Sequence, residues 1–164
     1  MLRAREIKPG ILPQRKNYHI NQKELQKARD VLNYSYTKSA KINIGPGLDP
    51  EQLESLEALT SRFARLSDII IQRIFRYLDT IDLEESGTAR DRINRAEKRE
   101  IIESAEKFIK IRLLRNEIAH EYKAETIYDI FERVLELTPA LLDSVDRILY
   151  YTEDKIFNSD TNFE

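Results

Sequence analysis

Apolar side chains recur at steps of three and four residues between positions 53 and 77, and this spacing marks one face of an α-helix. The residues are Leu53, Leu56, Leu59, Phe63, Leu66, Ile70, Ile74 and Tyr77. The run covers about seven helical turns. The chain has four glycines and five prolines in 164 residues, and no segment alternates with a two-residue period for long enough to form a strand. We therefore predict an all-α, up-and-down helical bundle of four to five helices.

The apolar stripe is wider than a single helix face. Ile69, Ile71, Phe75 and Leu78 lie beside the regularly spaced residues. A helix with such a broad apolar surface needs partners on more than one side. We therefore predict a homodimer in which Ile70, Ile71 and Ile74 contribute to a two-fold interface.

Breaks in the apolar pattern separate this helix from its neighbours. The run NIGPGLDP is the clearest break, and Asp49 followed by Pro50 is the pattern of a helix start. A loop around Gly87 follows the long helix. Pro139 either kinks the last helix or starts its second half. Further helices are predicted over 22–37, 93–118 and 127–149.

Three regions follow from this division. Residues 1–48 form a basic N-terminal arm, irregular over 1–20 and carrying the short helix. Residues 49–155 form the helical bundle, and residues 156–164 form a frayed tail.

Charge is distributed unevenly along the chain. Residues 1–41 hold ten Lys and Arg against three Asp and Glu, whereas the whole chain has a net charge of −2. Such an arm could bind RNA phosphates or an acidic partner surface. It could equally be a solvated tail that docks on its own acidic bundle.

Composition narrows the class of protein. The chain has no cysteine, which excludes disulfides and thiolate zinc sites. Its N-terminus lacks the apolar segment of a secretory signal, and its longest aliphatic run, Ile69–Ile71, is far too short to cross a bilayer. We expect a cytoplasmic protein with no membrane span.

One polar segment, RNEIAHEY at residues 115–122, stands out near the end of a predicted helix. It places Arg115 five residues before His120, Asn116 directly after the arginine, and Tyr122 two residues after the histidine. The full pattern arises by chance in about one such chain in two thousand. Arg115, Asn116 and His120 are therefore the candidate catalytic residues.

Other interpretations fit parts of this segment. A histidine near a helix C-terminus is stabilised by the helix dipole, and Arg115 could pair with Glu117 or Glu121. Glu117 and His120 match one half-site of a di-iron bundle, but the second half-site is missing. No nucleophile elbow and no phosphate-binding glycine loop occurs in the sequence. We therefore predict no metal and no cofactor.

Helical geometry limits how the segment can act. At about 100° per residue, Asn116 and His120 share a face, whereas Arg115 and His120 point about 140° apart. Arg115 and His120 can contact the same phosphate if the helix unwinds around 119–122, or if the long Arg115 side chain bends around the helix toward His120. The third possibility is a site shared across a dimer.

The pattern Arg-Asn-x-x-x-His-x-Tyr on a late helix of a small all-α bundle resembles the HEPN domains. More narrowly, it resembles the HepT-type toxins of the HEPN/MNT toxin–antitoxin systems. Arg115, Asn116, His120 and Tyr122 fill the signature without a gap, and the likeness covers residues 50–155. Residues 1–48 are longer and more basic than expected for the start of that family.

The resemblance implies a homodimeric, metal-independent endoribonuclease toxin with paired motifs facing a cleft between protomers. It also implies an antitoxin partner, a minimal nucleotidyltransferase that can transfer AMP to Tyr122. Some HEPN domains are inert binding modules, so a non-catalytic scaffold is the alternative. A helical dimerisation module of another kind is a third interpretation.

The residue types suit RNA cleavage without metal. The nucleophile is the 2′-OH of RNA, imidazole exchanges protons near neutral pH, and an arginine fork fits two phosphate oxygens. Lys107, Lys110 and Arg112 are candidate RNA-binding residues beside the motif. Arg90, Arg92, Arg95, Lys98 and Arg99 could also guide RNA, or the whole face could be solvated and paired with nearby glutamates.

Overall fold

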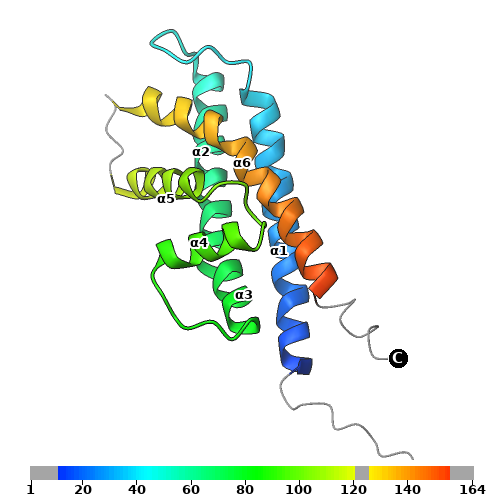
Figure 1. The fold of residues 1–164 in the computed structure, drawn as a ribbon. Coiled ribbons are helices and arrows are strands. Elements are labelled where there is room, and N and C mark those ends of the chain that lie inside the picture. The colour runs from blue at the N-terminus through cyan, green and yellow to red at the C-terminus, as the bar shows by residue number, and fades with distance from the viewer. Residues whose placement is uncertain (1–10, 121–125, 156–164) are drawn as a thin grey trace, which may run out of the picture.

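The computed structural model describes residues 11–120 and 126–155, with side chains from residue 22 onward. This part of the chain is helical and contains no strand. Its elements are α1 (Ile11–Ser39), α2 (Pro50–Asp68), the π-helix η1 (Ile69–Ile74), α3 (Phe75–Ile81), α4 (Ala89–Lys98), α5 (Ala105–His120) and α6 (Ile127–Glu153) (Figure 1). Because α2, η1 and α3 are continuous, these ranges form five helical rods, as predicted.

The rods do not all follow one axis. α1 and the α2–η1–α3 rod run side by side in opposite directions, and α6 packs against α1 and α2 (Figure 1). α4 and α5 lie across that pair, with α5 packed on α2 and α6. The predicted up-and-down order therefore describes the first two rods only. None of the helices in the described ranges is long and apolar enough to cross a membrane.

Residues near the N-terminus differ from the prediction. One helix runs from Ile11 to Ser39, where an irregular segment to residue 20 and a short helix over 22–37 were expected. Pro13 is tolerated because it lies in the first turn, where backbone N–H groups have no helical acceptor. Leu25, Ala28 and Leu32 are buried in the core cluster. α1 is therefore part of the bundle. Residues 1–10, which include three basic residues of the predicted arm, lie outside the described residues.

The start of α2 is confirmed. The Asp49 side chain accepts a hydrogen bond from the backbone N–H of Gln52 at 2.8 Å, and the Gln52 side chain accepts one from the Asp49 N–H at 3.1 Å. Pro50 occupies the first helical position. This capping box satisfies two backbone donors that the first turn cannot pair.

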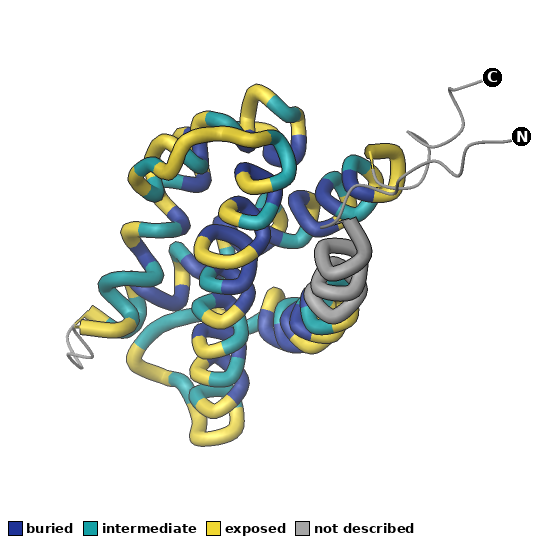
Figure 2. The backbone as a smooth tube through the Cα atoms, turned by 90° about the horizontal axis from the view of Figure 1, so that it is seen from below, coloured by how far each residue is buried: buried dark blue, intermediate teal, exposed yellow. Residues whose placement is uncertain are grey.

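The wide apolar stripe is buried within one chain. Ile69, Ile70, Ile71 and Ile74 expose no more than 4% of their surface. The π-turn at η1 adds one residue to the turn and shifts the apolar face, while α1 and α4 pack on η1 and cover it. Figure 2 shows the buried residues gathered on the inner sides of the rods. The expected role of Ile70, Ile71 and Ile74 at a two-fold interface is therefore corrected: these side chains are core residues.

The helix predicted over 93–118 is two helices, and the reason is a C-terminal cap without glycine. At the end of α4 the Ile101 N–H donates to the Ala96 carbonyl at 3.2 Å and the Glu100 N–H to the Glu97 carbonyl at 2.9 Å. This is a Schellman motif, and it places Glu100 at φ 59. α3 ends in the same way, with Leu83 at φ 56. Pro139, by contrast, does not end a helix, because α6 continues through it from Ile127 to Glu153.

Replacing Leu83 by glycine should stabilise the protein. Leu83 is 91% exposed, so its side chain buries little, but its Cβ is strained at positive φ. We expect Leu83→Gly to raise the free energy of unfolding by about 1 kcal/mol in urea denaturation with an unchanged m-value. Leu83→Ala keeps the strain and should match the parent chain. A less stable glycine variant would contradict this account of the cap.

Candidate functional site

The motif begins in a pocket where α5 crosses α2 and η1. The pocket has a volume of ≈ 400 Å³ and is lined by Ser67, Asp68, Ile71, Gln72, Arg73, Arg112, Arg115 and Asn116. Arg112, Arg115 and Asn116 come from consecutive turns of α5, and the other residues come from the end of α2 and from η1. The helix crossing therefore places three arginines and the motif asparagine around one hollow.

Arg115 is held by Asp68. Its Nη2 donates a 2.7 Å hydrogen bond to Asp68 Oδ2. Its Nε lies 2.7 Å from Asp68 Oδ1, an ion-pair contact without good hydrogen-bond alignment. The hydrogen bond to Asp68 raises the pKa of Arg115 despite partial burial. The carboxylate thus fixes the direction of the guanidinium, and the partner of Arg115 is neither Glu117 nor another residue of α5.

Asp68 could not be selected from the sequence. It lies 47 residues before Arg115, and no helical spacing links the two positions. Its only mark in the sequence is that a charged residue stands directly before three isoleucines. The packing of α5 against the end of α2 is what brings the two side chains together.

Asn116 and His120 occupy different environments. Asn116 is half-buried and lines the pocket, whereas His120 is exposed at the last residue of α5 and is not among the pocket residues. α5 is regular through His120, so it does not loosen up to that residue, and Arg115 reaches toward Asp68. One chain therefore brings Arg115 and Asn116 together but not His120. Tyr122, the predicted site of AMP attachment, lies outside the described residues.

Glu117 joins α5 to α6. The Arg133 guanidinium contacts both of its carboxylate oxygens, with Nη1 donating to Oε1 at 3.1 Å and Nη2 to Oε2. Arg133 also pairs with Asp129 one turn earlier on α6. The hydrogen bonds from Arg133 lower the pKa of Glu117. Within the described ranges, no three His, Cys, Asp or Glu side chains gather where they could hold a metal ion.

The three candidate RNA-binding residues do not form one surface. Lys107 and Lys110 pair with Glu103 and Glu106 on or beside their own helix at 3.7 and 3.3 Å. They line a second hollow between α5 and α6, which also contains Glu136 and Asp143. Arg112 instead lines the motif pocket beside Arg115. Arg112 is thus the member of this set that lies at the motif.

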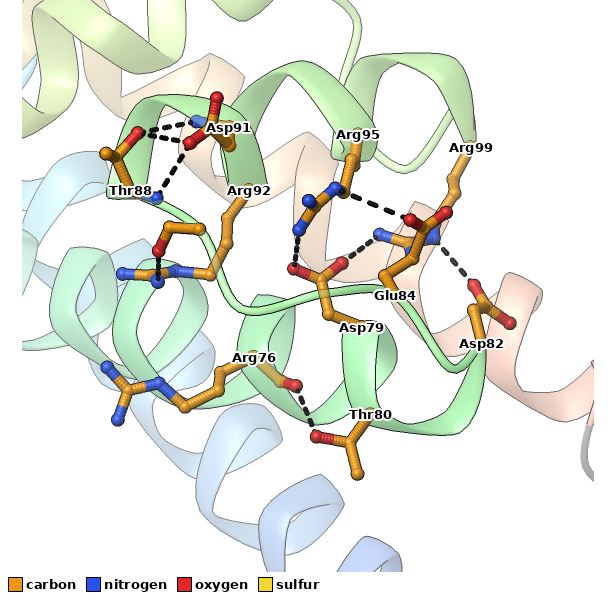
Figure 3. Close-up of polar contacts among 11 residues, drawn as sticks. Arg76, Asp79, Thr80, Asp82, Glu84, Thr88, Asp91, Arg92, Arg95 and Arg99 are labelled. Carbon is orange, nitrogen blue, oxygen red and sulfur yellow. Dashed lines mark hydrogen bonds and ion pairs between the residues drawn. The ribbon is translucent and has the colours of Figure 1, made fainter.

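Two further arginines considered as RNA guides are engaged in a partly buried network. Arg95 Nη1 donates to Asp79 Oδ2 at 3.0 Å, and Arg99 Nη1 donates to Asp79 Oδ1 at 2.7 Å (Figure 3). Arg99 Nε also donates to Asp82 Oδ2 at 2.8 Å. Burial opposes the charge of Arg99, but the hydrogen bonds to Asp79 and Asp82 outweigh it and raise its pKa. These contacts hold α3 against α4.

Comparisons of the chain with protein-family models, with curated proteins and with solved structures find no match. The likeness to HEPN domains therefore rests on the motif residues and on the helical bundle that carries them.

The Glu117–Arg133 pair should make stability depend on pH. Because Arg133 lowers the pKa of Glu117, the unfolded chain takes up this proton at a higher pH than the folded chain does. The stabilisation is complete above the ordinary pKa of Glu and is lost as pH falls through the lowered value. Both side chains are partly exposed, so we expect Glu117→Gln to lower the free energy of unfolding by about 1 kcal/mol at neutral pH.

The difference between Glu117→Gln and the parent chain should shrink as pH falls through the lowered pKa of Glu117, and it should vanish once the folded glutamate is protonated. Urea denaturation at a series of pH values measures it. Glu106→Gln is a matched control on the same helix, because Glu106 belongs to an exposed pair with Lys110; it should change stability by less than about 0.5 kcal/mol. A Glu117→Gln effect of constant size across the pH range would rule out the ion pair as its cause.

Proposed function

We propose that this protein is a metal-independent endoribonuclease toxin of the HEPN/MNT type. The observation that carries the proposal is the full motif in the sequence at residues 115–122, with Arg115 and Asn116 in the wall of a cationic pocket. RNA is the substrate class that fits, since a phosphodiester beside a 2′-OH supplies both the anion for the arginines and the nucleophile for the reaction.

The cleavage step is an in-line transesterification. The ribose 2′-oxygen forms a bond to phosphorus as the bond from phosphorus to the 5′-oxygen breaks, which leaves a 2′,3′-cyclic phosphate and a 5′-OH. One imidazole accepts the proton of the 2′-OH, and a protonated imidazole gives a proton to the leaving 5′-oxygen. Arg115 stabilises the negative charge that develops on the phosphoryl oxygens.

Asp68 is a positioning residue in this proposal. It engages Nε and Nη2 of Arg115, so the Nη1 edge has no partner among the described residues and can face a phosphate oxygen. A guanidinium fixed in this way loses less side-chain freedom when the transition state forms. The pair also keeps Arg115 in the pocket wall when RNA is absent.

A homodimer would bring the His120 of one protomer to the Arg115 of the other. Arg115 and His120 point about 140° apart on a regular helix, so one phosphate is reached by both only if a second copy contributes. Because the isoleucines of η1 are buried, the proposed contact surface is the exposed face of α5, which carries His120. Leu113 is 52% exposed there and lies seven residues before His120, on the same face of the helix.

A partner nucleotidyltransferase completes the system. Transfer of AMP to Tyr122 would put a bulky anion near His120 and would repel the RNA phosphate. Mass spectrometry of the chain after incubation with that partner, ATP and Mg²⁺ tests this step. Modification of Tyr128 instead of Tyr122, or no modification, would leave inhibition by complex formation alone.

One observation favours a second candidate function, a non-catalytic HEPN scaffold. Asp68 offsets the charge of Arg115, and His120 lies outside the pocket of its own chain. In that case the pocket binds a partner, and the chain cuts no RNA.

Loss of His120 should abolish cleavage. We expect His120→Ala and Arg115→Ala to reduce the rate of cutting an end-labelled, unstructured RNA by about 100-fold or more, with unchanged helical circular dichroism. Arg115→Lys should rescue poorly because lysine lacks the planar fork. Cleavage should persist in EDTA. Lys110→Ala, an exposed change on the same helix, should keep full activity.

Full activity of His120→Ala would refute the proposed chemistry. Absence of cleavage by the parent chain, with RNA binding retained, would favour the scaffold.

The dimer is tested through Leu113. Light scattering of the parent chain should give about twice the chain mass of 19.3 kDa. Leu113→Asp should give a monomer with lower cleavage activity, because the variant places an uncompensated charge in the contact. Leu83→Asp changes another exposed leucine away from α5 and should remain a dimer. A monomeric parent chain that still cleaves RNA would overturn the shared site.

A further inference from the structure

Three arginines near the motif pocket lack a carboxylate partner. Arg76 on α3, Arg92 on α4 and Arg112 on α5 form no ion pair within the described ranges. By contrast, Arg73, Arg95, Arg99, Arg115 and Arg133 each pair with an aspartate or glutamate. Arg62, Arg65 and Arg90 also form no ion pair in the described part of the chain, but Arg62 donates to Ser35, and Arg65 and Arg90 are exposed. What distinguishes Arg76, Arg92 and Arg112 is that their charges act on one another.

The three side chains come from three rods but lie close together. Figure 3 shows the guanidinium groups of Arg76 and Arg92 extending from neighbouring helices toward the same side. Burial is the largest cause that lowers the pKa of Arg92, and the charges of Arg76, Arg112 and Arg95 lower it further, while the charge of Asp79 opposes them. Arg112 lines the motif pocket one helical turn before Arg115. The group is thus continuous with the candidate active site.

The arrangement costs stability in the absence of a ligand. Arg92 is half-buried, its Nη1 donates to the Gly87 carbonyl at 2.8 Å, and its buried Nε has no hydrogen-bond partner in the described part of the chain. Like charges that approach one another repel, and a buried donor without an acceptor is unfavourable. An anion placed between the three guanidinium groups would relieve both costs.

We infer that Arg76, Arg92 and Arg112 form a phosphate track that binds the RNA backbone beside the scissile phosphate held at Arg115. This inference rests on the proposed function for the identity of the ligand, and it adds a binding surface to it. Arginine suits the role because its fork pairs with two phosphate oxygens, and contacts to the backbone are independent of base sequence. RNA should therefore enter along the seam between α3, α4 and α5.

Binding can be measured without cleavage. A fluorescent, unstructured 2′-O-methyl oligoribonucleotide has no 2′-OH nucleophile, so it reports affinity alone. The logarithm of its binding constant should fall linearly with the logarithm of salt concentration, and the slope should become shallower by about 0.7 for every phosphate that is no longer bound. We expect the triple change of Arg76, Arg92 and Arg112 to glutamine to reduce the slope by about 2.

Two control variants separate this track from a general charge effect. Arg147→Gln removes the same charge from α6, where Arg147 pairs with Asp143, and should leave the slope within about 0.3 of the parent value. The triple lysine variant keeps the charges and should keep most of the slope. The glutamine variant should also be at least as stable as the parent chain, because it removes mutual repulsion.

Cleavage and binding can fail separately. If the parent chain cuts RNA but the triple glutamine variant keeps the parent slope, the track is wrong and the nuclease stands. If the parent chain does not cut RNA but the slope falls as expected, the track stands and the nuclease is wrong. Absence of RNA binding by the parent chain, or equal displacement of RNA by poly-glutamate, would overturn the track in favour of an acidic protein partner.

Discussion

Burial of three consecutive isoleucines constrains the whole bundle. Ile69, Ile70 and Ile71 cannot share one side of a helix, so helices must cover that segment from several directions. Each fully buried isoleucine contributes about 2 kcal/mol, which makes the segment a large share of what holds a small domain together. α1 and α4 pack on it as a consequence. The crossing of α5 over this rod is also what places Arg115 against Asp68.

Features set by local pattern could be predicted from the sequence, and features set by contacts between distant residues could not. The apolar spacing and the Asp49–Pro50 start predicted the long helix correctly, because both signals lie within a few neighbouring residues. The break at Glu100 could not be predicted, since this cap lacks the usual glycine. The wide stripe indicated partners on several sides, but those partners are helices of the same chain and not another subunit. The motif residues could be selected from their residue types and spacing, whereas the pairing of Arg115 with Asp68 depends on the crossing of α5 over α2.

The contribution of each arginine depends on whether a carboxylate lies beside it, and the number of arginines in the chain does not show this. α4 carries Arg90, Arg92, Arg95 and, at its C-cap, Arg99, which are indistinguishable in a charge profile. Asp79 pairs with two of them, Arg95 and Arg99, and so links α3 to α4, while Arg92 forms no ion pair in the described part of the chain and feels the charges of Arg76 and Arg112. Arg92 and Arg99 lie seven residues apart and therefore on nearly the same face of the helix. Position along the helix axis separates their roles, because Asp79 lies beside the C-terminal part of α4, at Arg95 and Arg99, and not at Arg92.

The π-turn at η1 has a consequence for insertions and deletions. Asp68 and Arg73 at the motif pocket lie at the start of the turn and within it, whereas Arg76 lies just after it. Removing one residue from the turn would restore an α-helix and rotate everything beyond it by about 100° relative to α2. Arg76 would then leave the seam beside the pocket, and Leu78 would leave the core. The number of residues in this six-residue segment therefore determines which direction the side chains after it face. Insertions and deletions should be tolerated in the loops but not in this segment.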